Sequence, residues 1–268
     1  MMDEYRILRE AADEMYNAVW SKYEELKGKL DRGSISFKEF GKALDYSSAS
    51  ALRDYLERNK LFYRVVSEEW FRDYKPAVNN KILIVDPIDG TSNFVRGVPF
   101  SALSLALSNG ASLSDVYAAL VMNLFNRDVY YAYKGYGAFK NGRRIRVSRV
   151  RDTRISHMAI SITNAIPMKS PALYILRCTN YPRSFGSAAL EDCYVAEGRI
   201  DAHIDVRGDL RVYDIAASHF IVREAGGKVV VRQYDREYVS ILKEGGIKIV
   251  SASTPQLLER ILEIIRMI

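Results

Sequence analysis

Apolar side chains recur at three- and four-residue steps near the N-terminus, and this spacing predicts an amphipathic helix over residues 3–30 that stops at Gly33. A second helix is predicted over about residues 47–59. The pattern then changes to a short continuous apolar run at residues 81–85, which is typical of a strand covered on both faces. We expect this strand to end abruptly at the turn-forming sequence DPIDGT, residues 86–91.

Residues 100–148 have the short apolar runs of a β-rich segment, and Asn141-Gly142 between two such runs is the strongest short-range hairpin signal in the chain. The other strands predicted here are 101–107, 116–121 and 129–133. After about residue 155 strands and helices alternate. The predicted helices are 187–196 with a Ser187 N-cap and Gly198 at its end, 214–225 with an Asp214 N-cap and a Gly226-Gly227 stop, and 255–268. The pattern as a whole predicts a layered α/β protein.

Length and composition agree with a globular enzyme or binding protein. The 268 residues and the hydrophobic content of 48% are sufficient for a substantial core, and we predict a single domain over 1–268 with an N-terminal α+β part (about 1–150) and a C-terminal α/β part (about 151–268). Cys178 and Cys193 form no C-x-x-C pair, so we expect a reduced, cytoplasmic setting. The acidic N-terminus is unlike a targeting peptide, and no apolar run reaches the roughly 18 residues that span a bilayer.

The net charge of +6 raises the question of a nucleic-acid partner. The basic residues are scattered, apart from a modest cluster at Arg143, Arg144, Arg146, Arg149 and Arg151. A solvated hairpin edge explains this cluster at least as well as a binding surface does. A mild positive field also suits an enzyme whose substrate is a phosphate ester, so charge alone does not decide between these functions.

The segment with the most chemical information is the acidic turn after the apolar run at 81–85. Asp86 and Asp89 are three residues apart, Pro87 disfavours helical geometry, and Gly90 permits a tight turn. Two carboxylates held close together repel each other unless a cation neutralises them, and hard oxygen ligands suit Mg²⁺ or Mn²⁺ rather than zinc. Gly90 and Thr91 offer backbone N–H groups, and Thr91 a hydroxyl, to a phosphate.

Taken singly, each acidic segment also has an ordinary structural explanation. DPIDG is typical of a surface turn, Glu68-Glu69 is typical of a solvated loop, and Asp214 is typical of a plain helix cap. A buried strand that leads directly into the turn favours a functional site, as do the two further acidic segments.

Several motifs in a fixed order resemble those of the inositol monophosphatase family, from about Asp45 onward. They are Glu68-Glu69; DPIDGTSNF at 86–94; GAFKNGRRIRVS at 137–148; RSFGSAA at 183–189; GRIDA at 198–202; and YDIAA at 213–217 followed by EAGG at 224–227. The resemblance implies an αβαβα five-layer sandwich, commonly dimeric, and a Mg²⁺-dependent phosphatase. Each motif alone could be an ordinary turn, loop or helix cap, but all of them in this order favour the family resemblance.

The resemblance also implies a role for each matching residue. Glu68, Asp86 and the carbonyl of Ile88 would hold one Mg²⁺, and Asp86, Asp89 and Asp214 a second, with Mn²⁺ able to substitute. The N–H groups of Gly90 and Thr91 would bind the phosphate, and a metal-activated water oriented by Glu68 and Thr91 would attack phosphorus in line. Ser187 and Ala188 match positions that line the substrate pocket, and Asp205 lies near a position that contacts a substrate hydroxyl.

Two features bear on metal number and substrate. The family has a Lys, an Asp and a Thr before the acidic pair, and only Asp45 matches here, which leaves open a third metal and lithium inhibition. Residues 205–211, DVRGDLR, resemble archaeal members that hydrolyse both inositol monophosphate and fructose 1,6-bisphosphate. We hypothesise that Arg207 or Arg211 reaches the distal phosphate of a bisphosphate, the alternative being an arginine that only braces its loop.

The sequence therefore leaves three candidate functions. The first is hydrolysis of inositol 1-phosphate and/or fructose 1,6-bisphosphate. The second is a 3′-phosphoadenosine 5′-phosphate phosphatase, although 268 residues leave little room for an adenine site. The third is a regulator that binds RNA or protein, which only the basic composition favours.

Overall fold

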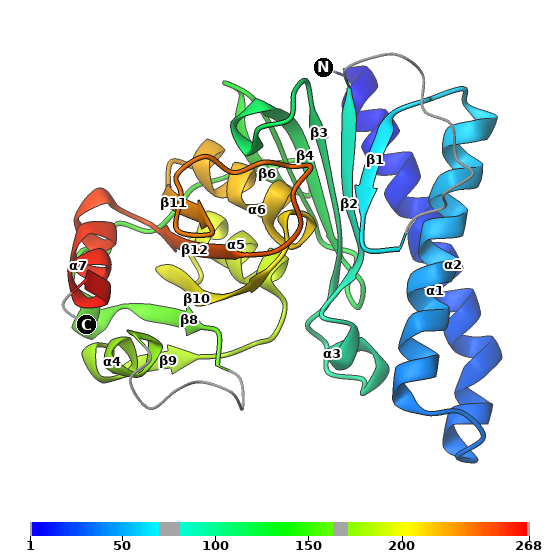
Figure 1. The fold of residues 1–268 in the computed structure, drawn as a ribbon, viewed down its shortest axis with the longest axis horizontal. Coiled ribbons are helices and arrows are strands. Elements are labelled where there is room, and N and C mark those ends of the chain that lie inside the picture. The colour runs from blue at the N-terminus through cyan, green and yellow to red at the C-terminus, as the bar shows by residue number, and fades with distance from the viewer. Residues whose placement is uncertain (1, 70–80, 163–170, 267–268) are drawn as a thin grey trace.

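The computed structural model describes residues 2–69, 81–162 and 171–266, and within these ranges seven α-helices and two β-sheets are stacked in layers (Figure 1). The helices are α1 (Met2–Asp31), α2 (Phe37–Arg58), α3 (Thr91–Val95), α4 (Pro171–Cys178), α5 (Ala188–Glu197), α6 (Val212–Glu224) and α7 (Pro255–Arg266). α1 and α2 cover one face of the first sheet, α5 and α6 lie between the sheets, and α4 and α7 cover the second sheet. The predicted αβαβα sandwich is confirmed.

The first sheet has seven strands in the order of the sequence. They are β1 (Arg64–Ser67), β2 (Ile82–Asp89), β3 (Ala102–Ser108), β4 (Val116–Asn123), β5 (Val129–Tyr133), β6 (Gly137–Lys140) and β7 (Arg143–Ile145). Only β1 and β2 are parallel; the other neighbouring pairs are antiparallel. The predicted hairpin joins β6 to β7, where Asn141 and Gly142 both have the positive φ that this turn requires.

β2 is the strand that was predicted from residues 81–85, and all eight of its residues are buried. Ile82 and Ile84 pack in the core shared with α5 and α6, whereas Leu83 and Val85 pack against α1 and α2. Successive side chains of a strand point to opposite faces, so a strand covered on both sides needs an unbroken apolar run. The predicted end at Asp86 is wrong, because β2 continues to Asp89.

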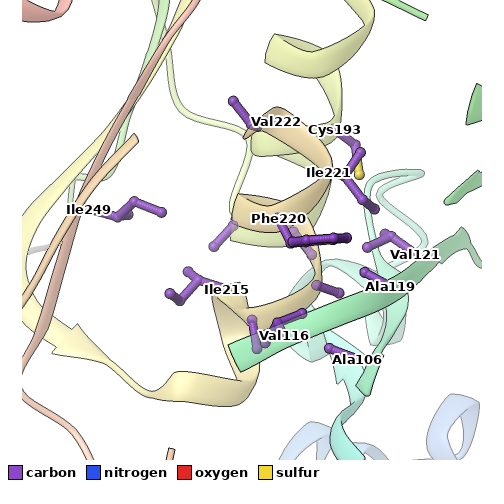
Figure 2. Close-up of a cluster of buried hydrophobic side chains, with 14 of the residues drawn as sticks. Ala106, Val116, Ala119, Val121, Cys193, Ile215, Phe220, Ile221, Val222 and Ile249 are labelled. Carbon is purple, nitrogen blue, oxygen red and sulfur yellow. The ribbon is translucent and has the colours of Figure 1, made fainter. Parts of the chain in front are cut away.

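The second sheet has five strands in the order β11-β12-β10-β8-β9, and it mixes parallel and antiparallel pairs. They are β8 (His157–Ile160), β9 (Tyr181–Arg183), β10 (Ala202–Leu210), β11 (Lys228–Gln233) and β12 (Ile247–Ala252). Figure 2 shows side chains of α6, among them Ile215 and Phe220, between Val121 of β4 and Ile249 of β12. The middle helices therefore join the two sheets through one hydrophobic core.

α2 begins about ten residues earlier than predicted, because a capping box that was not predicted starts the helix at Ser36. The hydroxyl of Ser36 accepts the N–H of Glu39, and the Glu39 carboxylate accepts the N–H of Ser36. Phe40 and Leu44 in the added turns are fully buried. The earlier start places Asp45 inside a helix that packs on β2.

The C-terminal helix was predicted to reach residue 268; α7 extends to Arg266, and residues 267–268 lie outside the described part of the chain. The predicted boundary near residue 150 falls between the two sheets, since β7 ends at Ile145 and β8 begins at His157. Among the described helices, none combines the length and the apolar character that crossing a bilayer demands.

Candidate functional site

The acidic turn owes its geometry to a β-bulge. Asp86 pairs with Ser104 and Asp89 with Ala102, so β2 has one residue more than β3 between the two pairs. In a regular strand, residues three apart point to opposite faces, and one extra residue brings them to the same face. Asp86 and Asp89 consequently face the same cavity, and the N–H of Ile88 donates to Asp86 Oδ1 at 3.1 Å.

Gly90 links the bulge to α3 and adopts a left-handed conformation, with φ of 80°. There is no room for a side chain at this position, because a Cβ would lie 3.0 Å from the carbonyl oxygen of Gly186 and 3.1 Å from that of Phe100. The Ser101 hydroxyl donates to the Gly90 carbonyl at 2.7 Å. The first N–H groups of a helix have no partner within the helix, and here those of α3 follow directly on the two aspartates.

Asp89 connects the two halves of the molecule. Its Oδ2 accepts the Ser187 hydroxyl at 2.5 Å and the Ala189 N–H at 2.7 Å, both at the start of α5. Ser187 is the N-cap of α5, as predicted, and its hydroxyl also accepts the Leu190 N–H. A carboxylate at a helix N-terminus is stabilised by the free N–H groups and by the helix dipole. The turn after β2 is thus attached to the wall formed by α5.

Asp214 is the third residue of α6, and the prediction that it is the N-cap was wrong. Arg211 precedes the helix, and its backbone N–H donates to Asp214 Oδ2 at 2.8 Å. The carboxylate thus still closes the start of the helix, but from inside its first turn. The Arg211 guanidinium lies 2.6 Å from Glu68 Oε1, at the end of β1, and 2.6 Å from the Tyr213 hydroxyl.

These segments enclose a cavity of about 540 Å³. All of the predicted site residues except Arg211 line it: Glu68, Asp86, Ile88, Asp89, Gly90, Thr91, Ser187, Ala188, Asp205, Arg207 and Asp214. Arg211 lines a neighbouring pocket. Asn93, Ser161, Ser184 and Glu191 also line the cavity, although they were not among the predicted site residues. Asn93 and Ser184 lie in motifs that were recognised, whereas Glu191 carries no local signal because it is one acid within a helix.

Burial disfavours the ionised form of the carboxylates that line the cavity. Burial raises the pKa of Asp89 to about 7 and that of Asp214 to about 6. Burial, followed by the charges of Asp89 and Asp214, raises the pKa of Asp86 well above its usual range. Acids gathered in this way need either protons or a cation to neutralise them.

Asp45, which matched the family by counting, also belongs to this site. Its pKa is raised to about 8, first by burial and then by the charges of Glu68 and Glu69, and its carboxyl is within hydrogen-bonding reach of Thr91. The Thr91 hydroxyl has one hydrogen, which donates to the Ile88 carbonyl at 2.8 Å. Rotation of the Thr91 hydroxyl would direct this hydrogen to the Asp45 carboxylate instead, an interaction that lowers the Asp45 pKa and so partly offsets the rise.

The donor set fits a hard divalent cation by its chemistry, since carboxylates and a backbone carbonyl are the ligands that Mg²⁺ prefers. In the described part of the chain, however, no three acidic, histidine or cysteine side chains are grouped closely enough to form a finished metal site. Two of the acids have other partners: Glu68 is paired with Arg211, and Asp89 is engaged by the start of α5. Glu68 would have to leave Arg211 in order to bind a cation.

Asp205 and Arg207 form the far wall of the cavity, on β10. Asp205 is fully buried, and its carboxylate accepts hydrogen bonds from the Arg207 guanidinium, one of them at 2.5 Å. Arg207 is partly exposed to the cavity. The geometry thus favours Arg207 over Arg211 as the arginine that meets a bound ligand.

Comparisons with known proteins agree with this arrangement. The sequence profile described as "Inositol monophosphatase family" matches residues 2–268. The fructose-1,6-bisphosphatase/inositol-1-monophosphatase of Methanothermobacter thermautotrophicus is 37% identical over 194 residues, 70% of this chain and 68% of that protein. The putative Nus factor SuhB of Neisseria meningitidis (serogroup A) is 34% identical over 241 residues, 87% of this chain and 86% of that protein.

A solved structure, inositol monophosphatase II from Staphylococcus aureus, superimposes with a TM-score of 0.80 at 22% identity, covering 97% of this chain and 94% of that one. At this identity the likeness concerns the fold alone. The match of the family profile over nearly the full sequence, together with the order of the motifs and their convergence on one cavity, leads to a single assignment. This chain belongs to the inositol monophosphatase family.

Proposed function

We propose that this protein is a Mg²⁺-dependent phosphatase that hydrolyses inositol 1-phosphate, fructose 1,6-bisphosphate or both. Family membership makes it a phosphoric monoester hydrolase. The observation that carries the proposal is the convergence of Glu68, Asp86, Asp89 and Asp214 on a cavity that also contains Arg207. Phosphoryl transfer depends on positioning and charge neutralisation, and this cavity supplies groups for both.

The acidic residues of the cavity would bind the metal ions of the proposed reaction. Glu68, Asp86, Asp89, Asp214 and the carbonyl of Ile88 would hold two Mg²⁺ ions, and Mn²⁺ could replace them. Bound divalent ions would activate water and neutralise charge on the transferred phosphoryl group.

The remaining groups bind the substrate and orient the attacking water. The N–H groups of Gly90 and Thr91 hold the phosphate, and the Thr91 hydroxyl, backed by Asp45, orients the attacking water together with Glu68. Ser187 and Ala188 form the side of the pocket, and Asp205 accepts a hydrogen bond from a substrate hydroxyl.

A phosphate-release screen tests the proposed activity. Purified protein is assayed with and without Mg²⁺ on inositol 1-phosphate, fructose 1,6-bisphosphate and 3′-phosphoadenosine 5′-phosphate. We expect Mg²⁺-dependent release from one or both of the first two. Release from the third alone would move the assignment to the nucleotide phosphatase, and release from none would contradict the proposal.

Removal of the metal should destabilise the protein most at neutral and alkaline pH. The pKa values of Asp89 (about 7) and Asp214 (about 6) are raised above the ordinary value of 3.8. The folded state therefore binds more protons than the unfolded chain between about pH 4 and pH 7, and metal-free stability falls as the pH rises through this window. We expect Mg²⁺ to raise the Tm more at pH 8 than at pH 5, as measured by thermal unfolding in EDTA and in Mg²⁺. An equal effect of Mg²⁺ at both pH values would contradict this prediction.

Activity on a bisphosphate would depend on Arg207. A guanidinium fork matches a phosphate geometrically, and Arg207 lines the cavity whereas Arg211 is paired with Glu68. Because Arg207 also neutralises the buried Asp205, replacement by alanine would leave an unpaired charge. Lysine keeps the charge and removes the fork.

We therefore expect Arg207→Lys to raise the KM for fructose 1,6-bisphosphate about tenfold, because that factor corresponds to the loss of one charge-assisted hydrogen bond. The KM for inositol 1-phosphate should change little. Arg211→Lys, which changes an arginine outside the cavity, is the matched control and should not discriminate between the two substrates. Steady-state kinetics on both substrates decide the matter. If neither variant selectively affects the bisphosphate, the arginines only brace their loop.

A second candidate is a regulator that binds RNA or protein, and it is favoured by the similarity to a protein named as a Nus factor. Arg143, Arg144, Arg146, Arg149 and Arg151 are all exposed on and after the edge strand β7. Filter binding to RNA over a salt series would separate this function from catalysis, since phosphate contacts weaken steeply with salt. Salt-dependent binding without phosphatase activity would favour the regulator.

A cytoplasmic location and a homodimer complete the proposal. Cys178 and Cys193 are both free thiols, which agrees with a reducing compartment. Light scattering after size-exclusion chromatography would report the oligomeric state.

A further inference from the structure

Behind the substrate wall lies a group of four polar residues that neither the sequence motifs nor the proposed reaction uses. Glu191 and Asp192 are on α5, His203 is on β10 and Ser218 is on α6. Each of them is at most 1% exposed. Charged side chains are almost never buried to this degree unless they are paired, so the contacts within the group need an explanation.

His203 lies between two carboxylates. Its Nδ1 is 2.9 Å from Asp192 Oδ1, and its Nε2 is 3.1 Å from Glu191 Oε2. The second contact lacks the alignment of a hydrogen bond, and its distance is that of an ion pair with a protonated imidazole. A neutral imidazole has one N–H and one lone pair, and the lone pair would face a carboxylate oxygen. Both contacts are favourable only when both nitrogens carry a proton. Burial by itself lowers the pKa of His203, but Asp192 and Glu191 outweigh it and raise the pKa well above its usual range.

Glu191 connects this histidine to the cavity. Its other oxygen, Oε1, accepts the backbone N–H groups of Phe185 at 2.8 Å and Gly186 at 3.2 Å. From the opposite side, Asn93 of α3 donates to the Phe185 carbonyl at 2.7 Å. The backbone of this loop is thus clamped between the phosphate turn and α5, and Gly186 and Glu191 both line the cavity.

The charge of Glu191 also reaches the candidate metal site, where it contributes to the raised pKa of Asp89. Without a cation beside it, the buried Glu191 carboxylate would repel an incoming phosphate ester and would lose the partner that fixes its orientation. Asp205, two residues after His203 on β10, adds a further buried acid, which Arg207 neutralises. His203 would neutralise the buried charge of Glu191, as Arg207 neutralises that of Asp205.

We propose that His203, as a buried imidazolium, is a positioning residue for substrate binding: it holds Glu191 against the 185–186 backbone and neutralises the acids beneath the pocket. This inference rests on the proposed phosphatase function for its kinetic consequence. Among the described residues that line the cavity His203 is absent, and it affects the cavity through Glu191. Groups that orient others from behind a site are typically worth ten- to a hundredfold in activity.

The kinetic test compares His203→Gln with a rescue variant. Glutamine removes the positive charge, so we expect the KM for the best substrate of the screen to rise about tenfold with a much smaller change in kcat. Adding Glu191→Gln should restore the KM, because the amide oxygen still accepts the two backbone N–H groups and the unpaired charge beside the cavity is removed, while Asp192 keeps its hydrogen bond from Ser218. Ser218→Ala is the matched control: it removes the hydrogen bond at the far side of Asp192 and should lower the Tm without changing the KM.

A second measurement does not depend on activity and stands even if the single variant folds poorly. The chain has three histidines, so spectra of protein labelled with ¹⁵N-histidine are simple to assign. At pH 8 we expect one imidazolium with both nitrogens protonated, absent in His203→Gln. His219 serves as the internal neutral reference, since burial lowers its pKa to about 4.

The outcomes separate this inference from the proposed function. A neutral His203 at pH 8 would overturn the inference whatever the enzyme does. An unchanged KM in His203→Gln, or a KM that Glu191→Gln fails to restore, would also overturn it. Absence of phosphatase activity in the wild-type protein would instead refute the proposed function, and the imidazolium signal would still decide the charge of His203.

Discussion

Asp86→Asn is expected to lower kcat on the order of a thousandfold, as the loss of a central electrostatic group does, while the protein remains folded. Asp86 is 4% exposed and lines the cavity together with Asp89 and Asp214. In the proposed site its carboxylate would help to hold both cations, and an amide cannot replace that charge. The same burial makes the ionised carboxylate unfavourable in the metal-free protein, because its pKa is raised by burial and by its acidic neighbours.

The variant should therefore have an unusual combination of properties. Its metal-free Tm should be higher than that of the wild type, and its response to Mg²⁺ in calorimetry should be reduced or lost. Asp201→Asn is a matched control: Asp201 is also a buried acid, but it accepts hydrogen bonds from Ser148 and from the His157 backbone, away from the cavity. We expect it to lower the Tm and to leave Mg²⁺ binding intact. Near-normal turnover in Asp86→Asn would count decisively against the mechanism.

Gly90→Ala is the second change with a large expected effect, and it acts through the backbone. The left-handed φ of 80° is costly for alanine, and the added Cβ would lie 3.0 Å from the Gly186 carbonyl oxygen and 3.2 Å from the Ser101 hydroxyl. We expect a loss of about 1–3 kcal/mol in the free energy of unfolding. A shift of the turn would also move the N–H groups that are proposed to bind phosphate, and kcat/KM should fall about a hundredfold.

Gly97→Ala separates the two causes. Gly97 has a similar φ of 71°, but a Cβ there would meet no atom within 4 Å. This variant should lose stability through backbone strain alone and should keep its activity. Urea denaturation and steady-state kinetics measure both quantities. If the two variants behave alike, the close approach of Gly90 to Gly186 has no role in catalysis.

The elements that the sequence predicted well are those with strong local signals. The hydrophobic period over residues 3–30, the apolar run at 81–85 and the Asn141-Gly142 turn each specify their structure within a short stretch of chain. The Ser187 cap of α5 is of the same kind. Errors occurred at boundaries, where a capping residue lay outside the apolar pattern: Ser36 starts α2, and α6 begins before Asp214.

The acidic motifs were visible in the sequence, but what each side chain contacts was not. Sequence spacing alone makes Arg207 and Arg211 equivalent. In the structure Arg207 pairs with Asp205 and lines the cavity, whereas Arg211 pairs with Glu68 and lines a neighbouring pocket. The pairing of Arg211 with Glu68 connects segments that are remote along the chain, so it depends on how the layers pack.

By itself, the sequence determined the type of chemistry: closely spaced acids after a buried strand, the glycine that the turn needs, and an order of motifs typical of one family. Only the tertiary structure decided that an extra residue in β2 turns Asp86 and Asp89 to the same face, and that His203 lies between Glu191 and Asp192. The physical reason is that local conformation follows from neighbouring residues, whereas burial and charge compensation are properties of groups that meet only when the sheets and helices stack.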